Sequence, residues 1–407
     1  MESHKKWDLL SVASIPLTMT LANSMLIPVL PAMQKALKIT SFQASLIITA
    51  YAAVAILFIP LAGYLSDRFS RKAVILPGLL IVSAAGAWAG LASLWSENAY
   101  TSILVARLVQ GFGSAGCFPV VLPLVGDLFK KDEDVSSGLG LVETANTFGK
   151  VLSPILGSAL AIWAWYIPFF AIPVFSIISF VLVLFFVKSP TKEDDSCKIS
   201  LKEFLKSITT VLRQKGKWLY GIFAVGGISM FLIFGGLFYL SETLELRGVK
   251  PLIKGLVLAI PLAFLCLVSF LSGKWIGQNK HVMKWTSFIG LSTAAAALLI
   301  VGLFNWETTW WIVTMLSIAS AGIGAALPSL DALITEGIEK EQCGTVTSLY
   351  SSMRFIGVAI GPPISALLMR GSMSTLFLVI ASTAFLAALI TIITIRPGRN
   401  ANHKEIN

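Results

Sequence analysis

Charged residues are scarce in this sequence: Asp, Glu, Lys and Arg make up 13% of its 407 residues, about half the level usual in soluble domains. Hydrophobic residues make up 56%, and the mean hydropathy is +0.82. A soluble domain could not bury that much apolar surface. The composition therefore excludes an ordinary soluble protein and favours one that lies in a lipid bilayer.

Residues that carry metal or catalytic chemistry are also few. The four cysteines lack the spacing of a metal site or a disulfide framework, and the three histidines stand apart near loops or termini. No nucleotide-binding loop or nucleophile motif occurs. We therefore expect no enzyme, no metal site and no bound cofactor.

Apolar runs of about 20 residues, long enough to cross a bilayer core, recur along the whole chain. The first run has no signal-peptide cleavage pattern after it, so we interpret it as a retained span. The sequence predicts an all-α membrane protein with twelve transmembrane helices, near 9–31, 43–65, 73–95, 101–125, 137–162, 168–187, 217–240, 252–272, 285–304, 309–330, 344–369 and 373–395.

One long polar connection divides these helices into two sets of six. We predict an N-terminal bundle over 1–187, a cytoplasmic linker over 188–216, a C-terminal bundle over 217–396 and a cytoplasmic tail over 397–407. Within the linker, apolar residues recur at helical spacing from Leu201 to Leu212. This pattern indicates an amphipathic helix on the membrane surface.

The basic residues are distributed unevenly between the two sides of this arrangement. Of 31 Lys and Arg residues, twenty-two fall in the termini and the loops after even-numbered helices, six in the opposite loops and three inside helices. The positive-inside rule therefore places both termini in the cytoplasm. Topology accounts for the net charge of +10, and we expect no nucleic-acid partner.

A helix-bending pattern occurs twice, 208 residues apart. The first copy reads GKVLSPILG over 149–157 and the second GVAIGPPIS over 357–365. Glycine permits close approach of another helix, and proline bends a helix. Bent helices in matching positions favour two halves that rock against each other. The predicted bend and interface residues are Gly140, Gly149, Ser153, Pro154, Gly157, Gly357, Gly361 and Pro362.

The loop between the second and third predicted helices reads GYLSDRFSRK over 63–72. It resembles the signature G-x-L-x-D-R-x-G-R-R/K of the major facilitator superfamily, with Ser70 at a position that is usually glycine. The resemblance implies twelve helices in two pseudo-symmetric six-helix bundles. It also implies that a cluster latches the halves together in an outward-facing state: Gly63, Asp67, Arg68, Arg71 and Asp127. These charges could instead only set the topology.

Two further motifs resemble those of the same family. The fourth predicted helix carries Arg107, Gln110, Gly111 and Gly113 as R-x-x-Q-G-x-G, and the buried arginine should face the protein interior or a wet cavity. The fifth runs from Gly140 to Ser158 and is similar to the motif G-x8-G-x3-G-P-x2-G-G of the drug/proton antiporters, with two glycines replaced by serine. This resemblance implies proton-driven export.

The fifth predicted helix also carries a polar stripe. Glu143 is the one acid of 21 that lies well inside a predicted span, and it shares a helix face with Asn146 and Lys150. Desolvation favours a protonated carboxyl, and a nearby cation favours the carboxylate. We hypothesise that Glu143 binds the transported proton and that Arg107 and Lys150 tune it. A purely structural Glu143–Lys150 pair is the alternative.

The family architecture implies that helices 1, 4, 7 and 10 line a central cavity and that helices 2, 5, 8 and 11 form the interface between halves. Arg354 could contact an anionic substrate or the carbonyls freed by Pro362 and Pro363. The aromatic and Met candidates could instead be plain packing residues. The candidate cavity residues are Asn23, Tyr51, Gln110, Asn146, Met230, Phe231, Phe234, Phe238 and Arg354.

Together these patterns predict a monomeric multidrug exporter of the bacterial cell membrane. It would exchange protons for a small amphipathic organic compound, cationic or neutral, with the proton gradient as its energy source. A dedicated exporter of one metabolite, such as a siderophore or peptide, is the main alternative. Proton-coupled nutrient uptake is a further one, which the fifth-helix motif disfavours.

Overall fold

The computed structural model describes residues 3–128, 132–187, 210, 213, 216–276, 279–304, 308–337 and 340–395. Over these residues the regular structure is entirely helical, which confirms the predicted fold class. Most of the predicted linker at 188–216 and the whole tail at 397–407 lie outside the described residues, so the predicted linker helix stays a prediction.

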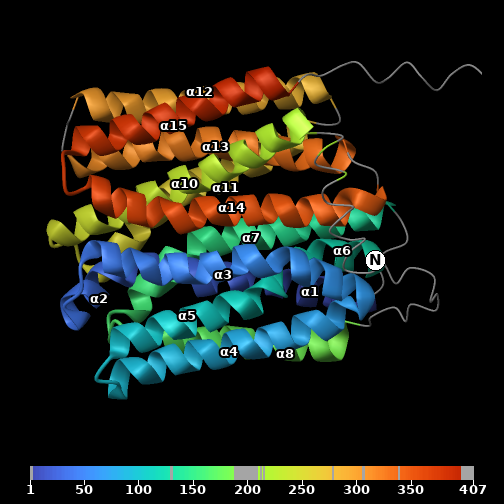
Figure 1. The fold of residues 1–407 in the computed structure, drawn as a ribbon, viewed down its shortest axis with the longest axis horizontal. Helices are drawn as coiled ribbons and strands as arrows, with labels where there is room; N and C mark the ends of the chain where they lie inside the picture. The colour runs from blue at the N-terminus through green and yellow to red at the C-terminus, as the bar shows by residue number, and fades with distance from the viewer. Residues whose placement is uncertain are drawn as a thin grey trace, which may run out of the picture.

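The helices run side by side in one bundle (Figure 1). Those of the first half are α1 (Ser3–Ser24), the 3₁₀ turn η1 (Ile27–Val29), α2 (Leu30–Leu37), α3 (Ser41–Arg68), α4 (Arg71–Trp95), α5 (Ala99–Ala115), α6 (Phe118–Leu128), α7 (Asp132–Leu160) and α8 (Ile167–Phe186). Those of the second half are α10 (Gly216–Leu246), α11 (Pro251–Trp275), α12 (Lys280–Phe304), α13 (Thr309–Gly337), α14 (Lys340–Leu368) and α15 (Met373–Thr394).

Counting α1 with α2 and α5 with α6 as single crossings, the described residues form twelve crossings. Eleven of these are long and apolar enough to span a bilayer. The exception is α7, the helix that carries the polar stripe of Glu143, Asn146 and Lys150. Its low hydropathy suits a helix that turns one face toward other protein helices or a cavity instead of lipid.

Two predicted spans are interrupted, which the sequence prediction missed. The first span breaks after Ser24 and continues through η1 to α2, where Pro28 and Pro31 stand in the first turns of the new segments. The fourth breaks at Gly116 and Cys117, just before Pro119 in α6. Proline lacks the amide hydrogen that would continue the preceding helix, so each proline begins a new segment.

The halves meet along two pairs of helices. Helix α3 packs along α14, and α7 packs along α11. Helices α3 and α14 are the second and eleventh crossings, and α7 and α11 are the fifth and eighth. The expected interface of crossings 2, 5, 8 and 11 is therefore confirmed. Within the halves, α7 packs on α1 and α14 packs on α10, the matching pairs of a pseudo-symmetric duplication.

The bend glycines make these close contacts possible. A methyl carbon at Gly157 would overlap the backbone oxygen of Met25 in the turn after α1, and one at Gly357 would overlap the backbone oxygen of Gly227 in α10. A methyl carbon at Gly149 would lie 3.2 Å from side-chain atoms of Leu17 and Thr20 of α1. These glycines thus lie where other segments approach closely. At Gly140, by contrast, no atom of the described residues lies within 4 Å of where its side chain would be.

Side-chain hydroxyl groups donate hydrogen bonds to backbone carbonyls that prolines at the interface leave without a donor. Pro363 cannot donate to Ala359 O, which accepts from Thr49 Oγ1 of the other half at 2.6 Å. Pro60 likewise cannot donate to Ile56 O, which accepts from Ser352 Oγ at 3.3 Å. The two bonds run in opposite directions between α3 and α14, so each half satisfies a bent helix of the other.

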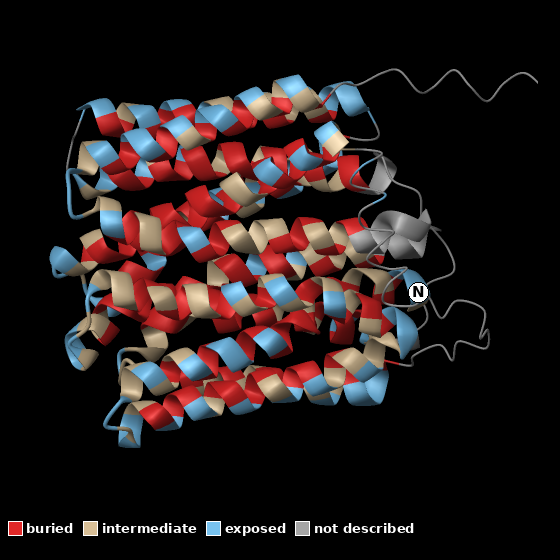
Figure 2. Cartoon of the chain, viewed as in Figure 1, coloured by how far each residue is buried: buried red, intermediate tan, exposed pale blue. Residues whose placement is uncertain are grey.

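The surface of the bundle is apolar. Figure 2 shows exposed residues along the outer faces of the peripheral helices and buried residues toward the middle of the bundle. Large exposed side chains on these faces include Trp95, Phe185, Trp275, Leu303 and Ile393. An apolar surface of this extent requires lipid around it.

Candidate functional site

A cavity of about 550 Å³ lies between the two halves. Its lining residues include the C-terminal ends of α3 and α6, which lie at the end of the bundle where the N-terminus lies (Figure 1). We call this the inner end because the basic residues predict it to be cytoplasmic. Asp67, Arg71 and Asp127 stand at its rim, and Glu143, Asn146, Asp331 and Arg354 lie on its walls. Its walls include α1, α6 and α13, which belong to the first, fourth and tenth crossings expected to line it. They also include α3, α7 and α14.

A deeper pocket of about 70 Å³ continues from this cavity. The two share Phe118, Asn146, Ser351 and Arg354. Six predicted wall residues line the deeper pocket: Asn23, Tyr51, Asn146, Met230, Phe234 and Arg354. The structure thus brings these six together at one pocket, and their contact with substrate stays a prediction.

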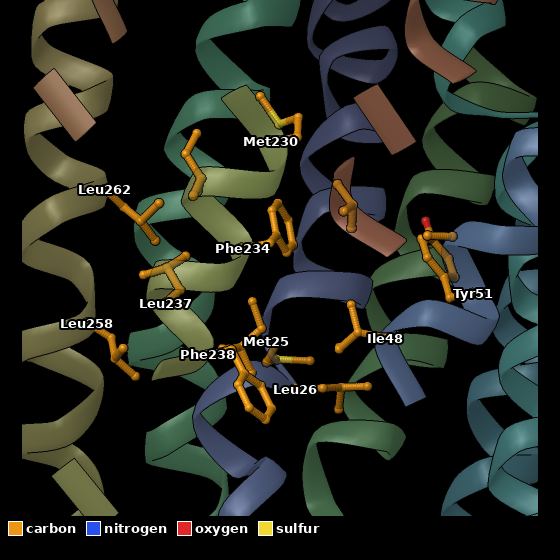
Figure 3. Close-up of a cluster of buried hydrophobic side chains, with 14 of the residues drawn as sticks. Met25, Leu26, Ile48, Tyr51, Met230, Phe234, Leu237, Phe238, Leu258 and Leu262 are labelled. Atoms are coloured by element: carbon orange, nitrogen blue, oxygen red, sulfur yellow. The ribbon is translucent and has the colours of Figure 1, made fainter. Parts of the chain in front are cut away.

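Three predicted wall residues lie elsewhere. Gln110 is fully buried against Arg107. The backbone of Phe231 faces Gly357 and Gly361 of α14. Phe238 packs in the apolar core near Met25 and Leu26, beyond the deep pocket (Figure 3). The sequence prediction missed this because several faces of α10 carry large apolar residues, and hydropathy does not distinguish the face toward the cavity.

Glu143 lines the main cavity from α7, one turn before Asn146. The amide Nδ2 of Asn146 donates to both carboxylate oxygens of Glu143, at 3.2 and 3.4 Å, and Asn146 Oδ1 accepts from Thr20 Oγ1 of α1 at 2.7 Å. This chain orients the Asn146 amide so that its donor group points at the carboxylate. The carboxyl group therefore has a hydrogen-bond partner and also borders the cavity, as a proton site requires.

Lys150 follows on the same face of α7 and lines the deep pocket. Its side chain is largely buried, and no hydrogen-bond partner for its Nζ occurs among the described residues. Lys150 therefore forms no hydrogen bond with Glu143 in the described structure, and the alternative of a structural Glu143–Lys150 pair is not supported.

Arg107 is fully buried, which confirms that it faces the protein interior. Its guanidinium donates to Asn23 Oδ1 at 2.7 Å, to Gln110 Oε1 at 2.6 Å, and to the carbonyl oxygens of Ala22 and Ile47. The ring of Tyr51 covers it, with 4.6 Å from Cζ to the ring centroid. Arg107 thus joins α1, α3 and α5, and its hydrogen bonds go to neutral acceptors. Its predicted tuning of Glu143 stays a prediction.

Arg354 has an acidic neighbour that the sequence prediction missed. Its Nη1 lies 3.7 Å from Asp331 Oδ1 of α13, and its guanidinium lies over the ring of Tyr350. The prediction ended the tenth helix at residue 330, but α13 continues to Gly337 and carries Asp331 into the cavity wall. Glu143 is therefore not alone in this region. Thr49 bonds one of the proline-freed carbonyls that were considered as partners of Arg354.

The predicted latch residues cluster within the first half. Arg71 bonds Asp127 at 3.0 Å, as expected, and also Asp67 at 2.5 Å and Ser66 at 2.7 Å. Arg68 reaches Tyr64 at 3.2 Å. Gly63 lies against the second half, where its side chain would stand 3.0 Å from Ser348 Oγ. The role of the cluster as a latch in an outward-facing state stays a prediction.

A second polar cluster closes the opposite, outer end. Gln34 of α2 donates to Glu242 of α10, and Lys35 bonds Glu245 at 2.6 Å. Lys254 of α11 bonds Glu245 at 3.0 Å. We call these five residues the outer gate. Glu242 and Lys254 are both buried, and α10 continues to Leu246, beyond the predicted span of 217–240.

The chain resembles membrane transporters. A family model described as Major Facilitator Superfamily matches residues 12–362 and 284–407. The bacillibactin exporter of Bacillus subtilis is 50% identical over 98% of this chain and 99% of its own, and the class B tetracycline resistance protein of Escherichia coli is 24% identical over 89% and 90%. A solved bacterial homologue of the human lysosomal transporter Spinster, inward-facing and unoccupied, superimposes with a TM-score of 0.75 at 16% identity, over 98% and 100% of the two chains.

Proposed function

The chain belongs to the major facilitator superfamily, and on that premise we propose that it exports a siderophore of the bacillibactin type in exchange for protons. The observation that carries the proposal is the 50% identity with the bacillibactin exporter over nearly the full length of both chains. This replaces the leading expectation of multidrug efflux with the alternative that was kept beside it, since the tetracycline resistance protein is only 24% identical.

The arrangement of the cavity supports transport by alternating access. The cavity lies at the inner end, and the outer gate joins the halves at the other end. Substrate would enter from the inner side, the halves would rock about the α3–α14 and α7–α11 interfaces, and the outer gate would separate to release it. Glu143 would bind a proton from outside before the halves return. The membrane would be the bacterial plasma membrane, with both termini in the cytoplasm.

Complementation tests the proposed substrate. We expect the chain, expressed in a Bacillus subtilis strain that lacks its bacillibactin exporter, to restore bacillibactin in the medium, as measured by liquid chromatography and mass spectrometry. Export should stop when an uncoupler dissipates the proton gradient. Restored tetracycline resistance without bacillibactin export would contradict the proposal and favour multidrug efflux.

The outer gate yields a prediction about conformation. Replacing Gln34 with alanine leaves the buried carboxylate of Glu242 without its donor, whereas separation of the halves would return it to water. Leaving a buried acceptor unpaired costs about 1–3 kcal/mol. We therefore expect Q34A to raise the outward-open population about tenfold or more, as measured by distances between spin labels at the outer ends of α2 and α10.

The matched control is K35A in the same gate. The side chain of Lys35 is 71% exposed, and exposed ion pairs contribute about 0–1 kcal/mol. The spin-label distances should therefore hardly change in K35A. Equal shifts in the two variants, or none in Q34A, would exclude the gate role of the Gln34–Glu242 bond.

A further inference from the structure

Two lysines are almost completely buried in the described part of the chain, and only one of them has a partner. Lys254 is 2% exposed and bonds Glu245. Lys150 is 8% exposed, and its Nζ has no hydrogen-bond partner among the described residues. A buried ammonium without an acceptor is strongly unfavourable, so Lys150 needs a function that outweighs this cost.

The acids around the cavity are already engaged. Asn146 donates to both oxygens of Glu143, and Arg354 Nη1 lies 3.7 Å from Asp331 Oδ1. Asp67 and Asp127 at the rim both bond Arg71. Among the described residues, none of these acids forms a hydrogen bond with Lys150 Nζ.

Aromatic rings from both halves surround the same deep pocket. Phe355 of α14 lies 6.2 Å from the ring of Tyr51 and 6.4 Å from that of Phe118, measured between centroids. Phe234 of α10 completes the set. Ring faces and edges of this kind favour stacking with a flat aromatic group.

We propose that Lys150 is the anion subsite of the exported compound and that the substrate is an aromatic anion. Its carboxylate or phenolate oxygen bonds Lys150 Nζ, and its ring packs among Tyr51, Phe118 and Phe355. Lys150 lines both the deep pocket and an adjoining space of about 10 Å³, and that narrow space admits only the charged edge of a ligand, so the ring stays in the wider part. The inference rests on the proposed export function, and it excludes the cationic substrates that the motifs first suggested.

Binding of three fluorescent probes with one ring system tests the subsite. Dansylglycine carries a carboxylate, dansylamide is neutral and dansylcadaverine carries an ammonium. We expect the purified full-length protein to bind dansylglycine at least about tenfold more tightly than either of the others, because a desolvated charge pair is worth that much or more. An equal affinity for all three, or a preference for the ammonium, would overturn the proposal.

Variants of Lys150 assign the preference to its ammonium. K150M should lose the preference for dansylglycine, K150R should retain most of it, and the exposed-lysine control K250M should bind as the wild type does. Thermal unfolding separates binding from structure. K150M should melt at or above the wild-type temperature, because it removes an unpaired buried charge, whereas K254M should melt lower.

A preference that persists in K150M, or a K150M protein that melts well below the wild type or fails to fold, would overturn the subsite, because either would mean that Lys150 serves another partner. Failure of bacillibactin complementation by the wild type, with the probe preference intact, would contradict the siderophore proposal and leave the subsite standing.

Discussion

Glutamine in place of Glu143 is expected to reduce export driven by a pH gradient to the level of protein-free vesicles. Glutamine has nearly the same shape and keeps an acceptor for Asn146 Nδ2, but it cannot bind a proton. Loading and release of substrate should survive, because the rest of the cavity is unchanged. E143Q should therefore still exchange labelled bacillibactin across the membrane at equal pH on both sides.

Reconstituted vesicles measure both activities on the same preparation. The control is E97Q, which changes an exposed acid outside the cavity and should leave both activities unaltered. D331N is the informative comparison, since Asp331 is the second acid of the cavity wall. Gradient-driven export that persists in E143Q and disappears in D331N would transfer the proton site to Asp331.

Alanine in place of Gly157 is expected to destabilise the protein strongly. The added methyl carbon would overlap the backbone oxygen of Met25, and neither backbone can move without separating α7 from the turn that follows α1. Overpacking typically costs about 1–3 kcal/mol, and we expect G157A to reach or exceed the upper end because the obstacle is main chain. G357A should behave alike, since it meets the backbone of Gly227 at the matching position of the second half.

Gly140 offers a matched control on the same helix as Gly157. No atom of the described residues lies within 4 Å of where its side chain would be, and alanine is the better helix former by about 1 kcal/mol. G140A should therefore unfold at or above the wild-type temperature in detergent, whereas G157A and G357A should unfold well below it. Equal melting of G157A and the wild type would show that α7 and the turn after α1 are not held in close contact by this glycine.

Local patterns predicted the features that depend on neighbours along one helix. The polar stripe on α7 and the glycine stripe of Gly149, Ser153 and Gly157 follow from the 3.6-residue period alone. The structure places Glu143 and Asn146 at the cavity and Gly149 against α1. The proximity of Arg71 and Asp127 was expected as well. The breaks at Pro28 and Pro119 were missed, although proline is their local cause.

Contacts between distant segments could not be predicted in this way. Asp331 and Glu242 stood at the ends of their apolar runs, where hydropathy cannot distinguish a solvated loop from a helix that continues into a packed interface. Gln34 gave no signal at all, because its importance comes from a carboxylate 208 residues away. Gly140 matched its motif as well as Gly157 did, yet within the described residues Gly157 meets the backbone of Met25 and Gly140 meets no other segment.

The amino-acid sequence by itself determined that this chain spans a bilayer many times as two related halves, because apolar runs and repeated motifs are properties of the chain. The tertiary structure alone decided which buried charges are satisfied: Arg107 by neutral acceptors, Arg354 by Asp331, and Lys150 by no described residue. The reason is that the stability of a buried charge depends on what the neighbouring helices place within a few ångströms of it, and helix packing brings together residues from all parts of the chain.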